Sequence, residues 1–540
     1  MKKLPFLLFI ILSFLLLSPN VLLQHHVMAL PLYTNSRWIV DGDGHRVKLA
    51  CVNWGAHLEA MVPDGLSRRS LDMISKEIIS LGFNCVQLTW PQFMVNDESL
   101  ASVTVRQSFK NLGLLESIVG IQVNNPSLLD LPLVSAYQAV VDNLAEKNLM
   151  VILDNRISKP GWHHSNFNGD KYFDTDLWIR GLTRTATIFN HTINVVGMSL
   201  SNEFEGNKQN VNNWYRYMQK GAEAVHAASP NVLVILYELN YDEDFAFFAK
   251  QPMNLPFTRK LVFGVHWSGF SDEKAWETGD LNQLCGNVVD KLMMEGQFVL
   301  GEGWPLFLSD FRPDLRGGNV NDIRFLNCLL GVAAEKDLDW ALGTGIDEAY
   351  GLLNSEWFGT GNASPMKRVS LLQSPFLDAG PDDLLNVRPH EMIFHPSTGL
   401  CVLRKSVIEP LKLGSCVESE SWAYTPQKTL VVKGTYFCLQ ADGVGKPAKL
   451  GIICNDPGSK WDLISDTKMH LSSKLADGSS VCLDVDSSNS IITNPCKCSS
   501  GAPNCDPTSQ WFKIVTTTTS STTAKHPNGN QEEYYYEPTN

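Results

Sequence analysis

The chain has 540 residues, of which 44% are hydrophobic and 19% are charged, so it holds enough apolar side chains for a buried core and is not a disordered chain. Its 44 basic and 57 acidic residues give a formal net charge of −13, which argues against binding to nucleic acid or to an anionic membrane. The length suggests roughly three or four average domains, although one α/β barrel takes up about 250 residues or more. Four of the twelve cysteines precede residue 400 and eight lie between Cys401 and Cys505, which indicates two domains of different construction.

The first 29 residues have the pattern of a secretory signal peptide. Lys2 and Lys3 precede an apolar run over residues 6–17, and small residues around Ala29 suit a cleavage site. A short membrane anchor is the alternative, but the run is short for a transmembrane helix, and no later stretch is apolar enough to span a bilayer. We therefore expect a secreted, extracellular protein, in the cell wall or apoplast if its source is a plant, without a membrane segment in its mature form.

Secretion brings the chain into an oxidising compartment, where disulfide bonds form. It also makes two Asn-x-Ser/Thr sequences candidate glycosylation sites, at Asn190 and Asn362. Such sequences also occur by chance, so each site is an expectation only.

From about residue 36 to 345, short apolar runs alternate with longer amphipathic stretches. The predicted strands are Leu49–Trp54, Phe83–Trp90, Leu149–Asp154, Val195–Asn202, Val232–Leu236, Leu261–Trp267, Pro305–Phe311 and Leu338–Thr344. The predicted helices between them include Leu71–Leu81, Val134–Lys147, Leu177–Phe189, Val211–Ala228 and Asn321–Glu335. This alternation indicates an α/β fold with a parallel sheet, and eight such units predict a (β/α)8 barrel over residues 30–380. An open doubly wound sheet is the alternative, which the lack of a glycine-rich fingerprint after the first strand disfavours.

Residues 385–515 have a different sequence pattern, with weak helical periodicity and many cysteines. A Cys-led strand recurs three times, each followed 21 to 29 residues later by a tryptophan. The three pairs are Cys401 with Trp422, Cys438 with Trp461, and Cys482 with Trp511. Such repetition predicts three copies of one all-β unit, and the pairing of the eight cysteines is not readable from their spacing. Residues 516–540 are polar and are predicted to be a disordered tail.

Two apolar strands end in acidic residues. One reaches Asn202 and Glu203, and the other contains Asp310 near its end. In a barrel, the carboxyl ends of strands surround the active site, so these carboxyl groups could face each other across it. Glycoside hydrolysis requires such a pair, one to protonate the leaving oxygen and one to attack or activate water. Taken alone, an acidic residue after a strand is more often a loop or helix-capping residue, so the pair becomes specific only with its surroundings.

Residues 36 to 376 resemble the barrel of glycoside hydrolase family 5, the cellulase family, and most of all a secreted plant branch of it. The matching landmarks are Cys51-Val52-Asn53-Trp54, Gly82-Phe83-Asn84, Leu88-Thr89-Trp90-Pro91, Leu153-Asp154-Asn155, Asn202-Glu203, His266-Trp267, Asp310 and Asp339-Trp340. The C-terminal part resembles the ricin-type β-trefoil that often follows the barrel in this branch. The resemblance thus implies a TIM barrel followed by a lectin-like β-trefoil domain.

The resemblance also implies roles for particular residues. Glu203 is expected to be the general acid/base, and Asp310 stands at the position of the nucleophile. Asn202 is expected to hydrogen-bond a sugar hydroxyl, with His266 in the same ring of substrate contacts. Arg156 is a candidate cation beside Asp310.

Four further side chains are candidates for sugar contact. Trp90 and Trp267 are candidate substrate contacts in the barrel, and for Trp90 plain packing is an equal alternative. In the C-terminal domain, Asp442 and Asp484 are the candidates, against the alternative of a structural appendage that binds no sugar.

The chain departs from the family pattern at several positions around the expected active site. The family has Glu at position 310, Arg at 87, His at 156, often Arg at 201, Tyr at 268 and Trp at 343, where this chain has Asp310, Gln87, Arg156, Ser201, Ser268 and Gly343. These changes leave catalysis by this chain open.

Three hypotheses follow. The first is a secreted hydrolase of the retaining type that cleaves O-glycosidic bonds of a β-linked polysaccharide or β-glycoside. The second is a carbohydrate-binding protein whose barrel has lost its chemistry, and the third is inverting hydrolysis through a gap widened by the shorter Asp310. We expect a monomer that binds carbohydrate but not nucleic acid and needs no metal or other cofactor.

Overall fold

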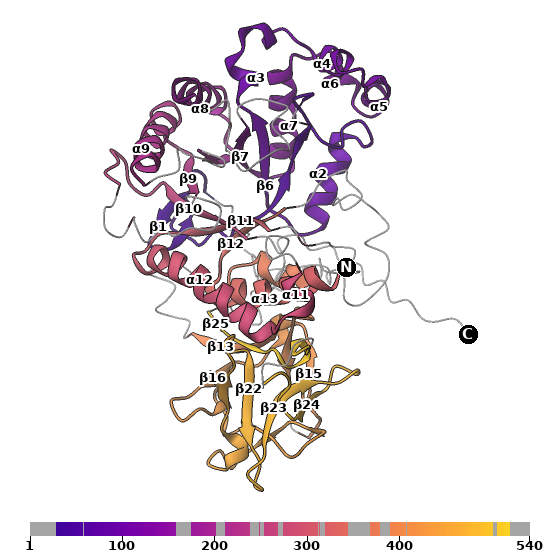
Figure 1. Ribbon diagram of the computed structural model, residues 1–540, viewed down its shortest axis with the longest axis vertical. Helices are drawn as coiled ribbons and strands as arrows, with labels where there is room; N and C mark the ends of the chain where they lie inside the picture. The colour runs from indigo at the N-terminus through magenta and orange to yellow at the C-terminus, as the bar shows by residue number, and fades with distance from the viewer. Residues whose placement is uncertain are drawn as a thin grey trace, which may run out of the picture.

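In the computed structural model, two regions stack along the long axis of the molecule, a barrel with its helices and a smaller β region (Figure 1). The described residues are 29–57, 59–157, 174–200, 211–237, 248, 253–267, 274–311, 313, 319–343, 368–377, 389–406, 408–499 and 505–518. Residues 1–28 of the predicted signal peptide and residues 519–540 of the predicted tail lie outside them. The start of the predicted tail at residue 516 is wrong, because Thr516 and Thr517 end the last strand, where they pair with Glu391 and His390. None of the described helices has both the length and the apolar character that crossing a membrane requires.

Eight parallel strands close into a barrel in the order β10-β11-β12-β3-β6-β7-β8-β9. They are β3 (Ala50–Trp54), β6 (Cys85–Pro91), β7 (Met150–Ile157), β8 (Val195–Ser199), β9 (Leu233–Tyr237), β10 (Leu261–His266), β11 (Leu306–Phe311) and β12 (Asp339–Leu342). The last strand pairs with the first, with Trp340 opposite Ala50. This closure confirms the predicted barrel and shows that the open-sheet alternative is wrong.

Helices cover the outside of the barrel between successive strands. The five predicted ones are confirmed as α2 (Leu71–Ser80), α7 (Leu133–Glu146), α8 (Thr175–Phe189), α9 (Val211–Ala228) and α13 (Val320–Lys336). The sequence analysis did not single out α3 (Phe93–Asn96), η1 (Glu98–Leu100), α4 (Val105–Asn111), α5 (Leu115–Asn124), α6 (Pro126–Leu129), α11 (Ala275–Thr278), α12 (Leu281–Gly301) or η5 (Ser370–Gln373). Side-chain caps explain several starts, because Ser70, Asp174 and Asp280 accept hydrogen bonds from backbone N–H groups of the first turn.

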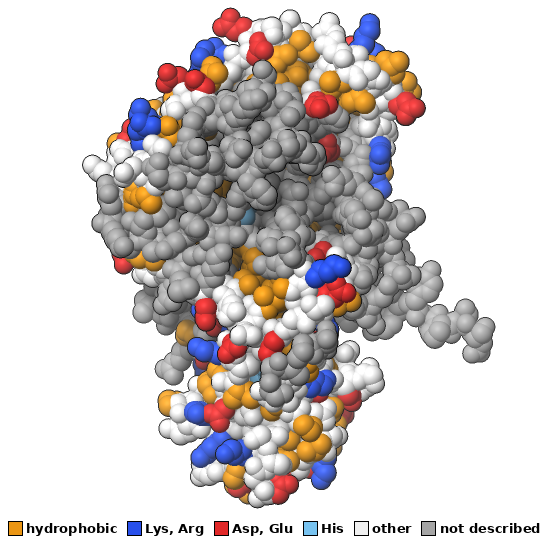
Figure 2. All heavy atoms as spheres, viewed as in Figure 1, with side chains coloured by type: hydrophobic (Ala, Val, Ile, Leu, Met, Phe, Trp, Pro, Cys, Tyr) orange, Lys and Arg blue, Asp and Glu red, His pale blue; other side chains and the backbone are white. Residues whose placement is uncertain are grey.

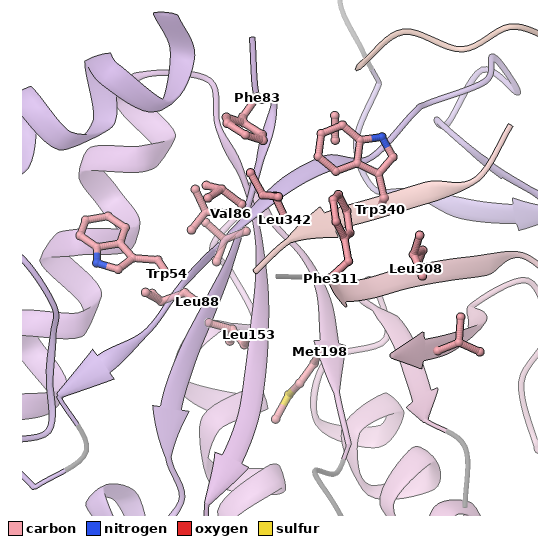
Figure 3. Packing of buried hydrophobic residues seen from close by; sticks show 14 of the residues in the cluster. Trp54, Phe83, Val86, Leu88, Leu153, Met198, Leu308, Phe311, Trp340 and Leu342 are labelled. Atoms are coloured by element: carbon pink, nitrogen blue, oxygen red, sulfur yellow. The ribbon is translucent and has the colours of Figure 1, made fainter. Parts of the chain in front are cut away.

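The barrel strands alternate side chains between two apolar layers. Outward side chains such as Leu88, Leu153 and Trp340 pack against the helices (Figure 3). Inward side chains fill the lower half of the barrel, among them Ile152, Phe307 and, on neighbouring strands, the disulfide between Cys51 and Cys85. The interior is therefore a packed core rather than a pore, as in other barrels of this type.

Two small hairpins accompany the barrel. They are β1 (Tyr33–Asn35) with β2 (Trp38–Val40) and β4 (Ala56–His57) with β5 (Val62–Pro63). The first lies near the start of β10, because the Thr34 N–H donates to the Arg259 carbonyl at 2.8 Å. This hairpin therefore lies at the end of the barrel where the parallel strands begin, opposite the end that carries their carboxyl termini.

The C-terminal region is built from strands β13 to β25 and short 3-10 turns. Its strands are β13 (His390–His395), β14 (Leu400–Leu403), β15 (Lys412–Gly414), β16 (Trp422–Tyr424), β17 (Leu430–Val432), β18 (Cys438–Gln440), β19 (Lys446–Pro447), β20 (Lys449–Gly451), β21 (Asp462–Ile464), β22 (His470–Lys474), β23 (Ser480–Val485), β24 (Ile491–Asn494) and β25 (Lys513–Thr517). Three turns lie among them, η7 (Cys416–Glu418), η8 (Pro457–Ser459) and η9 (Thr508–Gln510). The predicted all-β character is confirmed, while the trefoil arrangement stays a prediction.

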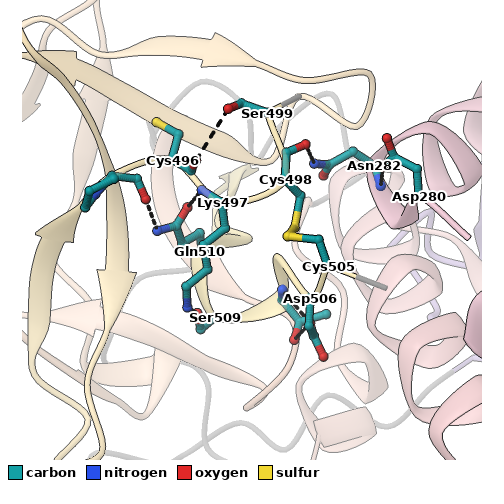
Figure 4. Close-up of a disulfide and its surroundings, with 12 residues drawn as sticks. Asp280, Asn282, Cys496, Lys497, Cys498, Ser499, Cys505, Asp506, Ser509 and Gln510 are labelled. Atoms are coloured by element: carbon teal, nitrogen blue, oxygen red, sulfur yellow. Dashed lines mark hydrogen bonds between the residues drawn. A yellow bond between two sulfur atoms is a disulfide. The ribbon is translucent and has the colours of Figure 1, made fainter. Parts of the chain in front are cut away.

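Each predicted repeat carries its own disulfide bond. The bonds Cys401–Cys416, Cys438–Cys454 and Cys482–Cys496 close segments of similar length, with separations of 15, 16 and 14 residues. The repeat tryptophans Trp422, Trp461 and Trp511 are all fully buried. A fourth bond, Cys498–Cys505, follows the third repeat strand (Figure 4). The repetition seen in the sequence thus corresponds to repeated local structure.

The C-terminal region packs against α12 and α13 of the barrel (Figure 1). A disulfide bond between Cys285 and Cys328 joins these two helices. Lys513 of β25 forms an ion pair with Glu335 of α13 at 2.8 Å. On the face shown in Figure 2, acidic and basic side chains are interspersed over the described surface of both regions.

Candidate active site

The inner lining of the barrel changes from apolar to polar toward the carboxyl ends of the strands. Below this level the inward side chains are apolar, as at Ile235 of β9 and Val262 of β10. In five strands the next residue on the same face, two positions on, is polar. In β10 the polar residue is four positions after Val262, and in β8 it is three after Val196, where the pairing with β7 shifts register. The inward polar residues come from seven strands and are Asn53, Gln87, Asp154, Ser199, Tyr237, His266 and Ser309. This polar end is the place where barrels of this type hold their active sites.

Tyr237 lies at the centre of this polar layer. Its hydroxyl accepts a hydrogen bond from Gln87 Nε2 at 3.1 Å and shares another with Ser309 Oγ at 3.1 Å. Its ring stacks on His266, with centroids 4.6 Å apart and planes 20° from parallel. The ring fits because Gly264 has no side chain: a Cβ there would lie 2.3 Å from Tyr237 Cε1. One phenol therefore joins β6, β10 and β11 across the barrel.

The end of β8 is held by a second set of hydrogen bonds. Ser199 Oγ donates to Asp154 Oδ1 at 2.6 Å and accepts from the Asn155 backbone N–H at 3.1 Å. The next carbonyl, that of Leu200, accepts from Asn155 Nδ2 at 3.1 Å and from Trp178 Nε1 at 2.9 Å. These bonds fix the chain immediately before the Ser201-Asn202-Glu203 segment.

The strand that carries Asp310 has an irregular end. Its pairing with β12 shifts register between Leu308 and Phe311. Ser309 faces inward to Tyr237, whereas Phe311, two residues on, packs edge-on against Trp340 in the outer layer, with ring centroids 5.8 Å apart. In a regular strand the two would share a face, so the strand bulges here, as strands often do beside active sites.

The expected catalytic side chains lie outside the described residues. Asn202 and Glu203 belong to the segment 201–210, which the structure does not describe. Arg156 and Asp310 fall within the described strands β7 and β11, but their side chains are not described. Their proposed roles therefore stay predictions.

The substrate contacts predicted from the sequence divide between the two faces of the strands. His266 is on the inner face, partly exposed and stacked on Tyr237. Trp267, the next residue, is on the outer face, 7% exposed and edge-on to Phe325 of α13. Trp90 is 2% exposed in the same outer layer. Strand alternation thus places both tryptophans in packing positions away from the inner face.

Among the remaining predicted sites, Asn190 is the C-cap residue of α8, and Asn362 lies outside the described residues. Asp484 is 2% exposed and accepts hydrogen bonds from Asn494 Nδ2 and Gln510 Nε2 at 3.0 and 3.1 Å. Although burial raises the pKa of Asp484, these hydrogen bonds outweigh it and lower the pKa. Asp484 is therefore an internal anchor of the third repeat.

Asp442, the other candidate in the C-terminal region, forms an ion pair with Lys449 at 2.5 Å on the surface. A hydrogen bond from that ammonium group lowers the pKa of Asp442. The carboxylate is therefore charged and already paired.

One group of side chains in the described part of the chain could together reach a metal ion, namely Asp41, Asp43 and His45. Asp41 Oδ1 already accepts from the backbone N–H groups of Asp43 and His45 at 3.0 and 2.9 Å. That arrangement is a side-chain-stabilised turn, and it precedes β3, at the opposite end of the barrel from the polar layer.

Sequence reasoning missed Tyr237, the residue that organises the polar layer. The predicted fifth strand ended at Leu236, one residue short of it. The sequence did contain a signal for it. Leu233, Ile235 and Tyr237 are spaced two residues apart, so all three are expected on the inward face of the same strand.

Comparison with known proteins identifies a matching family and a similar protein. Residues 72–315 match the cellulase family, glycosyl hydrolase family 5. A protein of Chamaecyparis obtusa described as a glycosyl hydrolase 5 family protein is 40% identical over 525 residues, which cover 90% of this chain and 93% of that one.

Two solved structures are similar in fold. A hyperthermophilic endocellulase from the archaeon Pyrococcus horikoshii has a TM-score of 0.52 at 18% identity, covering 64% of this chain and 99% of its own. The catalytic domain of the major endoglucanase of Xanthomonas campestris pv. campestris has a TM-score of 0.50 at 18% identity, covering 64% of this chain and 100% of its own. At these identities the likeness concerns the barrel fold.

Proposed function

Because the chain belongs to the glycosyl hydrolase 5 family, we propose that it hydrolyses O-glycosidic bonds of a β-linked polysaccharide at the carboxyl end of its barrel. The observation that carries this proposal is the polar layer there, to which seven strands contribute. The endocellulase and endoglucanase names of the similar structures support a β-glucan as the first substrate to test.

In the proposed reaction, Glu203 donates a proton to the leaving glycosidic oxygen while Asp310 attacks the anomeric carbon. The bond to the leaving sugar breaks and a glycosyl ester forms on Asp310, after which Glu203 takes a proton from water and the water hydrolyses the ester. The Ser199–Asp154 bonds support this role because they position the chain just before Glu203. The hydrogen bond between Tyr237 and Ser309 supports the role of Asp310, because it positions the residue immediately before Asp310.

Asp310 also favours a second outcome, inverting hydrolysis. Asp is shorter than the family's Glu by one carbon–carbon bond, about 1.5 Å. Retaining enzymes hold the two carboxyl groups about 5–5.5 Å apart and inverting ones about 6.5–9.5 Å apart, the latter with a water molecule between them. The withdrawn carboxylate would then act as the base that activates this water.

The alternative of a non-catalytic carbohydrate-binding barrel has its own supporting observation. The family has Arg at position 87, whereas Gln87 here is fully buried and donates to Tyr237. A neutral amide cannot favour the ionised form of a carboxyl group as a cation does. Catalysis by this chain therefore depends on whether Arg156 supplies the missing charge.

The test is hydrolysis of aryl β-glycosides, soluble β-glucan, xylan and mannan by the native chain, Glu203→Gln and Asp310→Glu. We expect turnover by the native chain, loss of at least about a hundredfold in Glu203→Gln, and a product whose anomer, followed by NMR, identifies retention or inversion. No turnover by the native chain or by Asp310→Glu, together with retention on a glycan column, would instead establish the binding protein.

We further propose that the protein is secreted, and that its C-terminal region is a ricin-type β-trefoil that attaches it to glycan. Six disulfide bonds among the described residues support an oxidising compartment. The three repeats, each with a disulfide and a buried tryptophan, support the trefoil. N-terminal sequencing of the mature protein, expected to begin at residue 30, tests secretion, and its carbohydrate content tests glycosylation at Asn190 and Asn362.

A further inference from the structure

The two helices that precede β8 and β9 in the chain each carry a buried tryptophan in their first turn. Trp178 is the fourth residue of α8 and Trp214 is the fourth residue of α9, and their side chains are 2% and 1% exposed. The two helices lie side by side on the outside of the barrel (Figure 1). Because each helix of such a barrel returns the chain from the carboxyl end of the strands to their start, its first turn lies beside the carboxyl ends.

Both indoles donate a hydrogen bond to a backbone carbonyl at the end of a strand. Trp178 Nε1 donates to the Leu200 carbonyl, immediately after β8, at 2.9 Å. Trp214 Nε1 donates to the carbonyl of Tyr237, the last residue of β9, at 2.9 Å. Among the described residues, strand pairing reaches no further than Ser199 in β8 and Tyr237 in β9. A buried carbonyl where the ladder ends still requires a donor, and each indole supplies one.

Close packing holds both indole rings in place. Gly221 of α9 leaves room for the ring of Trp178, because a Cβ there would lie 2.6 Å from Trp178 Cη2 and 3.2 Å from Leu200 Cδ1. Trp214 packs edge-on against Phe248, with ring centroids 6.5 Å apart. Since side chains in such packed layers occupy one conformation, each strand end is held by a rigid group. The position of β8 thereby depends on α9 as well as on α8.

Packing alone does not explain the two hydrogen bonds. Trp90 is buried in the same outer layer, yet its Nε1 atom has no partner among the described residues. A tryptophan can therefore fill this layer without reaching a carbonyl. The bonds of Trp178 and Trp214 are thus a separate feature, which the equivalent first-turn positions of α8 and α9 share.

The two strand ends carry groups that the proposed function uses. Leu200 is the last described residue before Glu203, the proposed general acid/base. Tyr237 joins Gln87 and Ser309 across the polar layer. A displacement of a reacting group by about 1 Å can lower a rate about a hundredfold, so the exact place where β8 and β9 end matters for catalysis.

We propose that Trp178 and Trp214 are positioning residues, which fix the carboxyl ends of β8 and β9 from the outer helices and thereby place the groups at the active end of the barrel. They act through the backbone and do not touch the substrate. The effect on catalysis rests on the proposed function, whereas the fixing of the strand ends does not.

Hydrogen–deuterium exchange of the full chain, followed by mass spectrometry, tests whether the indoles fix the strand ends. Trp178→Phe removes the donor and keeps an aromatic ring, and Asn155 Nδ2 still reaches the Leu200 carbonyl at 3.1 Å, so this variant should fold. We expect about tenfold faster exchange over residues 195–200 in Trp178→Phe and over residues 233–237 in Trp214→Phe. Each variant should leave the other strand end little changed.

Turnover of an aryl β-glycoside, measured well below the melting temperature of every variant, tests the effect on catalysis. We expect kcat to fall about tenfold or more in Trp178→Phe and Trp214→Phe, with KM within about twofold of the native value. Trp461→Phe is the matched control, because Trp461 is equally buried and its Nε1 donates to the Leu439 carbonyl at 2.9 Å in the C-terminal region. It should lose similar stability but keep the native kcat.

A second pair of variants moves the ring of Trp178 without removing its donor. Gly221→Ala should displace the ring and lower kcat. Gly286→Ala, at an equally crowded position of α12 where a Cβ would lie 2.4 Å from Asp466 Cβ, should not. This comparison separates the position of the indole from the general cost of crowding a helix.

The outcomes separate this proposal from the proposed function. Unchanged exchange at both strand ends in the tryptophan variants overturns the proposal, and so does an unchanged kcat in these variants of an active native chain. If the native chain hydrolyses no glycoside, the proposed function fails, and the exchange rates then decide by themselves whether the indoles fix the strand ends.

Discussion

At the scale of single residues, Tyr237 determines the arrangement of the polar layer. Its hydroxyl contacts Gln87 and Ser309, and its ring occupies the space left open at Gly264. Because Gln87 is fully buried and its Oε1 atom has no partner among the described residues, the Tyr237 contact is what holds this amide. Any loss of the hydroxyl leaves buried donors without partners.

We therefore expect Tyr237→Phe to lower the free energy of unfolding by about 1–3 kcal/mol, measured by urea denaturation. Under the proposed function, kcat should also fall while KM changes little, because Ser309 loses its anchor next to Asp310. Tyr137→Phe is the matched control: its buried hydroxyl donates to the Thr89 carbonyl at 3.0 Å from outside the barrel. It should cost similar stability but leave kcat unchanged, and equal kcat losses in both variants would contradict a role in positioning.

At the scale of elements, the turn from α13 into β12 is fixed by a buried ion pair. Asp337 caps α13 in the left-handed conformation, with φ 49° and ψ 49°. Its carboxylate lies 2.6 Å from Lys48 Nζ and accepts from the Phe376 and Leu377 backbone N–H groups at 3.1 Å each. Burial alone raises the pKa of Asp337, but the charges of Lys48 and Arg46 and these hydrogen bonds outweigh it and lower the pKa.

Asp337→Asn removes the charge and keeps an acceptor, and Asn tolerates the left-handed conformation. It leaves the buried Lys48 ammonium group without its hydrogen-bonded counter-charge, so we expect a loss of about 3–5 kcal/mol of unfolding free energy. Replacing Lys48 by Met in the same chain should restore much of the loss. A small effect of Asp337→Asn at neutral pH would show that the charge is not what stabilises this turn.

The same pair predicts a pH dependence of stability. A carboxyl group whose pKa is lower in the folded state stabilises the fold above its unfolded pKa, and this contribution disappears as pH falls through the folded value. Since the ordinary pKa of Asp is about 3.9, the native chain should lose stability relative to Asp337→Asn only below about pH 4. Denaturation curves of both proteins from pH 7 to pH 3 measure this difference.

At the scale of the whole molecule, the C-terminal region and the barrel meet over α12 and α13. Gly331 of α13 allows the closest approach, because a Cβ there would lie 2.7 Å from Met469 Cε. Lys513 and Arg324 add ion pairs, to Glu335 at 2.8 Å and Asp506 at 3.3 Å. The Cys285–Cys328 bond keeps the two helices at a constant spacing beneath this contact. The two regions are therefore expected to unfold together.

Gly331→Val should overpack this contact and lower stability by about 1–3 kcal/mol. We expect the single calorimetric transition of the native chain to broaden or split, because the barrel and the C-terminal region would then melt separately. Gly301→Ala is the control, since a Cβ at this helical glycine would meet no atom within 4 Å. A single sharp transition in Gly331→Val would show that the two regions are not coupled through α13.

The features of the fold that depend on residues close together in the chain could be predicted from the sequence. Those that depend on contacts between distant residues could not. The alternation of apolar strands with amphipathic stretches predicted all eight barrel strands and five of the helices, because local periodicity reflects which face of each element is buried. The Cys-led repeats likewise predicted three similar units, each of which proved to contain a local disulfide of similar span, with a second one, Cys498–Cys505, in the third unit. The pairing of the cysteines could not be predicted from the sequence, because it depends on which strands are neighbours in the folded chain.

The sequence by itself therefore determined the strand-helix order, the repeats and the family resemblance, all of which are carried by near neighbours in the chain. Only the tertiary structure decided that Tyr237 reaches Gln87 and Ser309, which are 150 and 72 residues away, and that Trp90 and Trp267 face the helices. It also brought Asn282 of α12 to the Cys498 carbonyl of the C-terminal region, 216 residues away. The reason is that closing the barrel and packing a second region on it bring distant residues together, and local sequence patterns carry no information about that geometry.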